Sequence, residues 1–418
     1  MTKNNLKPAL RFKGFTEAWE QYKLSDLFEK GGSGGTPLST NPDYYNGNIP
    51  FLGISDITNS NGLILETEKY ITVKGLDNSA AWIVPSGSIS LAMYASVGKL
   101  AILGVNAATS QAFYNMVFNS DSVRDFVYHR LYKANSDSEW DKLISTGTQS
   151  NLNAEKVKEF EISIPNNDLE ISKIGSLFRT LDNLITLHQR KYDSLVNIKK
   201  SLLQKMFPQK NQNTPEIRFK GFTEAWEQRK LSDLAKATGG TSIESEFIEG
   251  GKYKVISIGS YGEDSKYRDQ GIRANKTSKT QERILSKGDL TMILNDKTAS
   301  GNIIGRVLLI DQDDMYVYNQ RTQRLEIDKV IYDPQFIYHY LNADSIRNKI
   351  IKASQGNTQI YVNYSNICKF EYFLPIRKDE QIKLGEFFEK LDNLITLHQR
   401  KLEKLKNVKK ACLKKMFV

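Results

Sequence analysis

Two long stretches of this chain occur twice, and this duplication constrains its fold more than any other feature of the sequence. The stretch LDNLITLHQRK runs from Leu181 to Lys191 and again, without a change, from Leu391 to Lys401. A second stretch, RFKGFTEAWEQ, occupies residues 11–21 and 218–228. Identical repeats this far apart indicate an internal duplication. Because solenoid repeats are only about 20–45 residues long, we expect two large units rather than an array.

The segments between the repeats differ from each other and have the pattern of two globular domains. Apolar or alternating runs, broken by Gly, Pro, Ser and Asn, predict short strands at 50–57, 69–75, 80–103, 112–118 and 160–165, and at 252–261, 283–294, 302–311, 324–327 and 370–375. Helices are expected near 121–133 and 334–354. The predicted fold class is therefore α/β (α+β), with a twisted β-sheet in each of two globular domains.

A long amphipathic helix is predicted after each globular segment. Apolar residues recur at steps of three and four along both segments, which is the 3.5-residue period of a coiled coil. We expect the helices to pair antiparallel, with a pseudo-two-fold relation between the repeats and a polar central layer that fixes the register. The residues expected at this coiled-coil or partner interface are Leu181, Leu184, His188, Lys191, Leu195, Leu391, Leu394, His398, Lys401 and Leu405.

The repeats and a polar, proline-bracketed linker divide the chain into six segments. We expect an N-terminal conserved segment at 1–21, the first globular domain at 22–165, the first helix at 166–209, the linker and repeated segment at 210–228, the second globular domain at 229–375 and the second helix at 376–418. A helix of roughly 34 residues is about 50 Å long. Such a rod could span two DNA half-sites that lie one duplex turn, about 34 Å, apart.

The positive charge of the chain is concentrated in the two helices. The formal net charge is +10, and residues 181–210 and 391–418 contribute +4 and +6 to it. This distribution fits a phosphate-bearing partner, although a solvated basic helix face is the alternative. There are two cysteines, no apolar run of membrane-spanning length and no apolar signal core. We therefore expect a cytoplasmic protein with no membrane partner.

No catalytic motif in the sequence is complete. NPDYY, beginning at Asn41, has Asp43 where the Asn-Pro-Pro-Tyr motif of adenine methyltransferases has its second proline. GGSGG lacks the GK[ST] that completes a P-loop, and the four His and two Cys have no metal-ligand spacing. We therefore expect a non-catalytic chain. The alternatives are a stand-alone methyltransferase or nuclease, and a scaffold that binds only protein.

Polar and aromatic loop residues are the candidates for reading DNA, because their donors and acceptors match base edges and phosphates. Those in the first domain are Thr36, Tyr44, Tyr45, Tyr94, Ser96, Lys99, Ser110, Gln111, Thr148, Gln149 and Asn151. Those in the second are Ser257, Tyr261, Asn295, Lys297, Asn302, Arg306, Gln320, Arg321, Asn357, Thr358, Gln359 and Tyr361. The Thr-Gln pairs at 148–149 and 358–359 carry the same chemistry at one place in both halves. Lys99 and Arg306, each after a glycine, are expected to contact phosphate.

The full chain resembles the specificity subunits of type I restriction-modification systems, the HsdS family. The resemblance rests on the LDNLITLHQRK-type helix after each domain, on the FxGFxxxWEQxKLxDL stretch before each domain, and on the run from GGTP through IPFLGISDI to Pro85. It implies that each globular domain is a target-recognition domain for one half of a bipartite, gapped site in double-stranded DNA. It also implies that the helices set the spacer.

The resemblance implies partners as well. The helices would dock two adenine methyltransferase subunits (HsdM), and motor-nuclease subunits (HsdR) would complete the restriction complex. S-adenosylmethionine, ATP and magnesium would then belong to the partner subunits, so no cofactor and no metal is expected in this chain. A degenerate subunit without a DNA target is the alternative.

Overall fold

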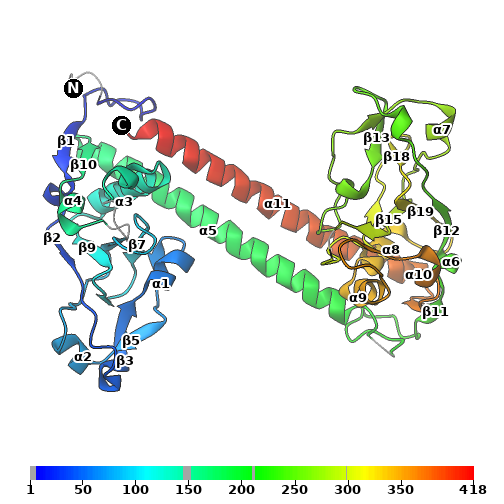
Figure 1. Ribbon diagram of the computed structural model, residues 1–418, viewed down its shortest axis with the longest axis horizontal. Helices are drawn as coiled ribbons and strands as arrows, with labels where there is room; N and C mark the ends of the chain where they lie inside the picture. Colours follow the sequence, from blue (N-terminus) through cyan, green and yellow to red (C-terminus); the bar gives the residue numbers. More distant parts are fainter. Residues whose placement is uncertain (1–5, 145–151, 210–211, 298) are drawn as a thin grey trace. The chain divides into compact units, whose positions relative to one another are not determined.

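The computed structural model describes residues 6–144, 152–209, 212–297 and 299–418. The chain forms two compact units, elements of which are labelled in Figure 1. The first unit comprises residues 1–190 and 399–418, and the second comprises residues 191–398. Each unit therefore contains one globular domain and one part of each long helix, α5 (Asp168–Lys205) and α11 (Lys378–Met416). This division differs from the predicted one, in which the helices are segments of their own.

The first domain is built on a five-stranded sheet of order β2-β9-β6-β7-β4. Its strands are β2 (Lys30–Ser33), β9 (Phe113–Val117), β6 (Ile89–Ala92), β7 (Leu100–Leu103) and β4 (Leu63–Ile64). Smaller sheets join β5 (Lys69–Ile71), β3 (Tyr45–Leu52) and β8 (Ala108–Thr109), and β1 (Glu20–Lys23) with β10 (Glu161–Ile164). Ile89 and Leu91 of β6 pack into the core that contains Phe126, while Ala92 belongs to a second core. Alternate side chains of β6 thus face opposite sides of the sheet, and there is an apolar core on each side.

Helices and turns complete the first domain. These are η2 (Leu24–Asp26), η3 (Pro42–Tyr44), α1 (Ile54–Asn59), α2 (Val73–Asp77), α3 (Asp121–Ser136), η4 (Glu139–Lys142) and α4 (Ala154–Lys158). The predicted strand at 50–57 was wrong in its second half, where α1 forms instead. The Gly53 N–H donates a hydrogen bond of 2.7 Å to the Asp56 carboxylate, which caps the first turn of α1.

The second domain repeats this plan with a four-stranded sheet of order β12-β19-β15-β17. Its strands are β12 (Ala235–Gly239), β19 (Thr322–Ile327), β15 (Leu290–Ile293) and β17 (Val307–Leu309). The smaller sheets pair β14 (Arg273–Ala274), β13 (Tyr253–Ile256) and β18 (Tyr316–Tyr318), β11 (Glu227–Arg229) with β21 (Tyr372–Leu374), and β16 (Asn295–Asp296) with β20 (Ile360–Tyr361). Short helical elements are α6 (Leu231–Leu234), η5 (Glu244–Glu246), η6 (Ile258–Ser260), α7 (Ser278–Gln281) and α10 (Tyr364–Ile367).

The single helix predicted at 334–354 is two helices, α8 (Pro334–Leu341) and α9 (Asp344–Lys352). The break falls at Asn342, whose side chain pairs with the backbone of β17. Its Nδ2 donates to the Val307 carbonyl at 3.0 Å, and its Oδ1 accepts from the Val307 N–H at 3.1 Å. The side chain of Asn342 is thereby fixed to the sheet at the point where α8 ends.

The two long helices pair antiparallel within each unit, as predicted. In the first unit the ring centroids of Phe178 and Phe417 are 5.4 Å apart, and Asp182 binds Lys409. In the second unit Phe388 and Phe207 are also 5.4 Å apart, and Asp392 binds Lys199. As the number rises along one helix, the partner number falls along the other. Every residue in the second set lies 210 positions from its counterpart in the first, so the duplication extends to individual contacts.

The seam between the helices uses only half of the residues predicted for the coiled-coil or partner interface. Leu181, Leu195, Leu391 and Leu405 are buried or half-buried, as expected. The other predicted row faces solvent, because Leu184 and Leu394 are 37% and 43% exposed and Lys191 and Lys401 are exposed. The buried row lies one residue further on, and on α11 it contains Phe388, Ile395, Leu402, Lys409 and Met416. The residues of the expected polar layer, His188, Lys191, His398 and Lys401, are divided between the two units, and their pairing stays a prediction.

The repeated RFKGFTEAWEQ stretch fastens each domain to the start of its helix. Arg11 makes two hydrogen bonds, of 2.6 and 2.8 Å, to the buried carboxylate of Glu170, and Arg218 makes the same two to Glu380. Packing within each unit therefore explains why an arginine occupies this position in both copies.

The end of the chain is part of the core of the first unit. Leu413, Met416 and Phe417 belong to the same buried cluster as Trp19 and Phe126. The Phe417 ring centroid lies 5.1 Å from that of Phe126 and 6.5 Å from that of Trp19. Phe207 takes the corresponding place beside Trp226 and Phe336 in the second unit.

Candidate nucleic-acid interface

Predicted DNA-contacting loops of the first domain converge where β6 ends. The Met93 N–H donates to the Ala112 carbonyl at 2.8 Å, and the Leu152 N–H donates to the Met93 carbonyl at 2.8 Å. Residue 93 thereby joins the loop of Tyr94 to the loop that ends at Gln111 and to the residue that follows segment 145–151. Thr36 Oγ1 donates to Gln111 Oε1 at 2.6 Å, which brings in the glycine-rich loop.

The second domain repeats this arrangement where β15 ends. The Leu294 N–H donates to the Arg321 carbonyl at 3.4 Å, and the Val362 N–H donates to the Leu294 carbonyl at 2.9 Å. Next to them, Asn295 pairs with Tyr361 in the ladder of β16 and β20. Loops 295–297, 319–321 and 355–361 are therefore neighbours. The two domains thus hold corresponding loops at the ends of equivalent strands, although the sequences of the loops differ.

Two glycines at corresponding positions allow this close approach. A Cβ on Gly34 would lie 1.9 Å from the Thr109 carbonyl oxygen, and a Cβ on Gly240 would lie 1.8 Å from the Asn319 carbonyl oxygen. Both distances are far below van der Waals contact, so no larger residue fits without moving the backbone. The close approach of the backbone therefore explains why glycine occupies these two positions, without a bound nucleotide.

The predicted contact residues fall into three classes of exposure. Those whose side chains are exposed are Thr36, Tyr94, Ser96, Gln111, Lys297, Asn302, Gln320, Arg321, Asn357, Thr358, Gln359 and Tyr361. Those that are half-buried are Tyr44, Tyr45, Lys99, Ser110, Asn295 and Arg306. Thr148, Gln149 and Asn151 lie outside the described residues. Tyr94 and Tyr361 are notable, because large exposed aromatic rings suit contact with bases or sugars.

Two predicted contacts need correction, because the side chains are in the protein interior. Tyr261 is 4% exposed and packs with Ile256 and Leu308, and Ser257 is also buried. Burial raises the pKa of the Tyr261 hydroxyl above its ordinary value. Neither side chain reaches the surface on which a duplex could lie.

Arg306 is held by its own domain. Its Nε donates to the Asn302 carbonyl at 2.7 Å, and its Nη1 donates to Ser265 Oγ at 2.9 Å. Burial lowers the pKa of the Arg306 guanidinium, against the raising effect of Glu263 and Asp264. A phosphate contact by Arg306 would have to compete with these partners, so its main role here is to shape the loop.

Sequence reasoning missed the buried groups that support the loops. Arg347, from α9, donates to the carbonyls of Gly301 and Ile304 at 2.9 and 3.2 Å and so anchors the loop that carries Asn302. Burial lowers the pKa of Arg347 to about 10. In the first domain, the buried Asn115 amide donates to Thr109 Oγ1 at 2.8 Å. The signal for Arg347 is an arginine on the apolar face of a helix.

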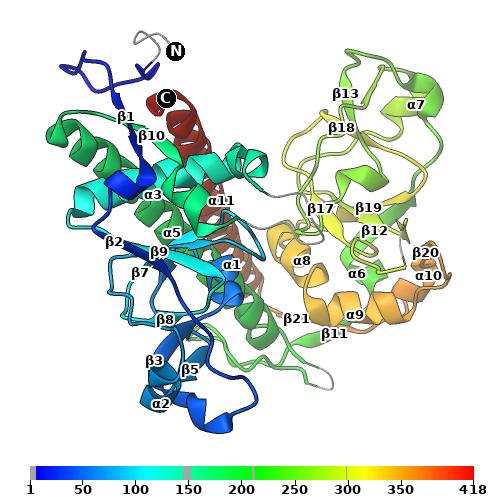
Figure 2. The same cartoon turned by 60° about the vertical axis from the view of Figure 1, so that its left-hand side comes forward.

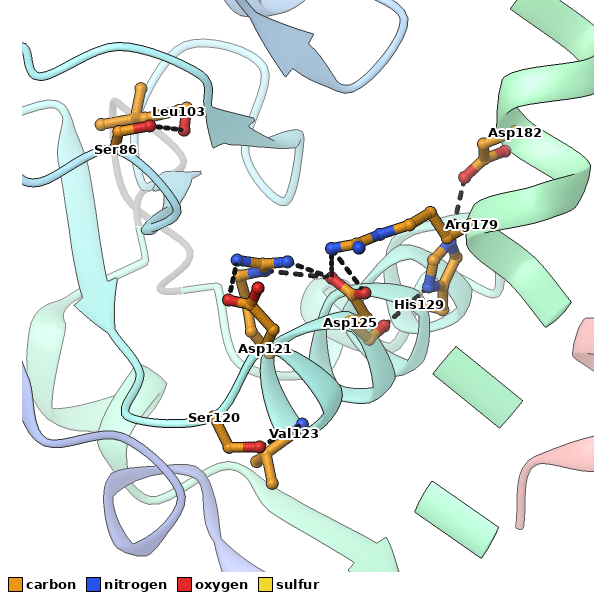
Figure 3. A network of polar contacts seen from close by, with 10 residues as sticks. Ser86, Leu103, Ser120, Asp121, Val123, Asp125, His129, Arg179 and Asp182 are labelled. Atoms are coloured by element: carbon orange, nitrogen blue, oxygen red, sulfur yellow. Dashed lines mark hydrogen bonds and ion pairs between the residues drawn. The ribbon is translucent and has the colours of Figure 1, made fainter. Parts of the chain in front are cut away.

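A half-buried carboxylate in each unit lies between the globular domain and both long helices. Asp182 of α5 lies 2.9 Å from His129 Nε2 of α3 and 2.5 Å from Lys409 Nζ of α11. Figure 3 shows His129 pointing from α3 to Asp182, with Asp125 beside Arg179. Figure 2 shows α3 alongside the two long helices in the first unit. We refer to His129, Asp182 and Lys409 as the first clamp.

The surroundings of Asp182 in the first clamp favour its ionised form. Burial opposes ionisation of Asp182, but the hydrogen bond from His129 and the charge of Lys409 outweigh it, so the pKa of Asp182 is lowered. His129 Nδ1 lies 2.7 Å from the Asp125 carbonyl. Because the carbonyl and the carboxylate both accept, the ring makes both hydrogen bonds only when it carries two N–H groups.

The second unit has the corresponding clamp, formed by His339, Asp392 and Lys199. Lys199 Nζ lies 2.6 Å from Asp392, but His339 Nδ1 lies 3.9 Å away, beyond hydrogen-bond distance. Burial, together with the charge of Lys199, lowers the pKa of His339 well below its ordinary value. The sequence carried a signal for both clamps, because FVYH at 126–129 and FIYH at 336–339 are 210 residues apart.

The fold and the site define a class of protein: a duplicated chain of two α/β globular domains, each joined to part of an antiparallel helix pair and each presenting a cluster of polar loops. A family described as "Type I restriction modification DNA specificity domain" matches residues 16–197 and 223–407. The chain therefore belongs to the type I restriction-modification specificity-subunit family, as its resemblance predicted.

Individual relatives agree with this assignment. The chain is 24% identical to the type I restriction enzyme MjaIX specificity subunit of Methanocaldococcus jannaschii, over 95% of this chain and 92% of that one. It is 26% identical to the MjaVIII specificity subunit of the same organism, over 60% and 61% of the two chains. The crystal structure of a type I restriction-modification S subunit from M. genitalium has the same fold, with a TM-score of 0.63 and 16% identity over 99% of each chain.

Proposed function

We propose that this chain is the DNA sequence-specificity subunit of a type I restriction-modification complex and that each globular domain reads one half of a bipartite, gapped DNA site. The observation that carries the proposal is the matching convergence of loops at Met93 and Leu294 in two domains whose loop sequences differ. One scaffold that holds two different sets of polar side chains suits a target whose two halves differ in sequence.

A methylation map tests this function directly. The full chain is co-expressed with a matching methyltransferase subunit, and the host DNA is sequenced with detection of modified bases. We expect N6-methyladenine in one gapped, two-part motif, with the modified adenines on opposite strands of the two halves. A stable complex that adds no motif to the genome would contradict the proposal and favour a degenerate subunit or a protein scaffold.

The domains are proposed to read their half-sites independently. Exchange of residues 22–165 for those of another member of the family should then change one half of the methylated motif and leave the other unchanged. The clamp from α3 to the helices has to be kept at the new junction, because His129 makes contacts with both α5 and its own helix. A change in both halves of the motif would show that the domains do not read separately.

The long helices are proposed to set the spacer between the half-sites. α5 is one uninterrupted helix from Asp168 to Lys205. An insertion of four residues between Lys191 and Leu202, about one helical turn, adds roughly 6 Å at 1.5 Å per residue. We expect a longer spacer with both half-sites unchanged, and an active complex with the original spacer would refute the ruler.

The same helices are proposed to dock two methyltransferase subunits. Leu184 and Leu187 are exposed in the first unit, and their counterparts Leu394 and Leu397 are exposed in the second. Packing within the chain does not explain why these four leucines are identical in the two repeats. A partner that binds the same surface twice would explain it, since exposed apolar side chains are a mark of interfaces.

A stoichiometry measurement tests the docking surface. Leu184→Ala with Leu187→Ala should reduce the bound methyltransferase from two copies to one in native mass spectrometry, and Leu394→Ala with Leu397→Ala should do the same. Val408→Ala, an exposed apolar position on α11 outside the identical stretch, is the matched control. Two bound copies in both double variants would contradict docking at this surface.

The chain is proposed to act without chemistry of its own, so that S-adenosylmethionine, ATP and magnesium are used by the methyltransferase and motor-nuclease subunits. Within the described ranges, no three His, Cys, Asp or Glu side chains lie close enough to hold a metal ion. The same residues contain no helix that is both long and apolar enough to cross a membrane. An assay of the purified chain alone should show neither methyl transfer nor cleavage, and either activity would refute this part of the proposal.

A further inference from the structure

The first unit contains a basic cavity of about 1000 Å³ among α1, α3, α5 and α11. Its lining includes six lysines from three separate parts of the chain and two aspartates. The lysines are Lys99 from the loop between β6 and β7, Lys133 from α3, and Lys406, Lys409, Lys410 and Lys414 from α11.

The two aspartates already have lysine partners. Asp137 binds Lys133 at 3.0 Å, and Asp182 binds Lys409 in the first clamp. In the part of the chain that the structure describes, no carboxylate lies within 4 Å of Lys99, Lys406, Lys410 or Lys414. Four positive charges therefore line a concave surface without compensation, and their mutual repulsion would be relieved by a bound polyanion.

The internal repeat shows that helix pairing does not require Lys406 or Lys414. Val196 and Gln204 of α5 occupy the positions that correspond to Lys406 and Lys414 of α11. Ala343 corresponds to Lys133 of α3. The second unit thus has the same helix pair and the same kind of clamp but not the same set of lysines.

We propose that this cavity is a binding site for the sugar–phosphate backbone of duplex DNA, present in the first unit and absent from the second. The inference rests on the proposed function. Lys99 connects the cavity to the exposed loop of Tyr94, so one duplex could contact the loop with its bases and the cavity with its phosphates. Lysine is suited to this role because it contacts phosphate as a point charge and carries no base specificity.

The test replaces two lysines with the residues that the chain itself uses at the corresponding helix positions. The variant is Lys406→Val with Lys414→Gln. The matched control is Lys390→Thr with Lys404→Ser, which also removes two positive charges and also takes the repeat-equivalent residues. Lys390 is in the second unit, and Lys404 does not line the cavity. Thermal unfolding of both variants verifies that the chain is folded.

The measurement is the dependence of duplex affinity on salt concentration for the full-length chain. Each phosphate contact contributes a slope of about 0.9 to log K against log salt. We expect the cavity variant to lose about 1.8 from the slope relative to the control, with an unchanged methylation motif in the complex. Equal slopes for the two variants would overturn the inference, as would loss of methyltransferase binding with an unchanged slope, because the cavity would then take a protein segment.

These outcomes are separate from failure of the proposed function. If the unaltered chain shows no salt-dependent affinity for duplex DNA, the proposed function fails and the cavity proposal fails with it. If the unaltered chain binds duplex DNA but the cavity variant matches the control, only the cavity proposal fails.

Discussion

The two clamps should differ in strength, and this difference can be measured within one molecule. We predict that Asp182→Asn destabilises the first unit more than Asp392→Asn destabilises the second. Asp182 accepts from both His129 and Lys409 within hydrogen-bond distance, whereas Asp392 has Lys199 at 2.6 Å and His339 only at 3.9 Å.

The magnitude follows from burial and from the number of hydrogen bonds. The side chains of Asp182 and Lys409 are 27% and 10% exposed, and removal of one partner of a buried ion pair costs about 3–5 kcal/mol. Because Asp182 is partly solvated, we take the lower end, about 3 kcal/mol. A hydrogen bond to a charged group contributes about 1.5–3 kcal/mol. The corresponding cost for Asp392→Asn should therefore be smaller by about 1.5 kcal/mol.

Hydrogen exchange with mass spectrometry gives the assay, since unfolding of a two-unit chain need not be two-state. A loss of 3 kcal/mol should speed exchange of α3 amides about 100-fold, with α8 unchanged. Asp392→Asn should affect α8 and leave α3 unchanged. Equal acceleration in the two variants would refute the assignment of an extra hydrogen bond to the first clamp, and acceleration of both domains by either variant would refute its local action.

Three further perturbations follow from the structure. The stabilising effect of Asp182 should be complete above its unfolded-state pKa, about 3.9, and should be lost as the pH falls through its lowered folded-state pKa. The urea midpoints of the unaltered chain and of Asp182→Asn should therefore converge in acid. A difference between the two midpoints that stays constant with pH would contradict this linkage. Arg347→Met leaves two buried carbonyls without a donor and should lower the free energy of unfolding by about 2–3 kcal/mol. In a methylation map, recognition of the half-site read by the second domain should be lost, and recognition of the other half-site should be kept. Intact recognition of both half-sites would refute the role of Arg347. Ile395→Ala should lower the free energy of unfolding by about 3 kcal/mol because the side chain is buried in the seam. Leu394→Ala, at the exposed neighbouring position, should lower it by less than about 0.5 kcal/mol. Equal losses in the two variants would contradict the placement of Ile395 in the seam.

The sequence was sufficient for the large-scale organisation. Exact repeats require two equivalent units, and turn residues between short apolar runs are typical of α/β domains with small sheets. The sequence alone could not show which row of helix residues is buried in the seam. Leu184 and Ile185 are adjacent and both apolar, as are Leu394 and Ile395, so either row satisfies the heptad pattern, and packing of large residues such as Phe388 selects the second.

The candidate interface could be predicted only in part. Loop composition identified polar segments, and several of them do converge, but their convergence depends on backbone hydrogen bonds at Met93 and Leu294 that no local pattern encodes. The sequence also did not indicate that Tyr261 is buried, because the residues around a tyrosine do not distinguish one in a polar loop from one in a core. The Asp182 clamp joins three segments that are far apart in the chain, although the repeated FVYH and FIYH stretches marked one of its members.

The position of Phe417 has a consequence for synthesis of the protein. A ribosome has made the rest of the first globular domain long before it reaches Leu413, Met416 and Phe417, yet these three residues complete the core of that domain. The surfaces around Trp19 and Phe126 in the nascent first domain therefore stay incomplete until residues 413–417 have been made. The second domain has Phe207 available before its own strands are made. We expect the domain that is translated second to reach its native state first, and loss of residues 413–417 to damage the first domain, which lies more than 200 residues earlier in the sequence.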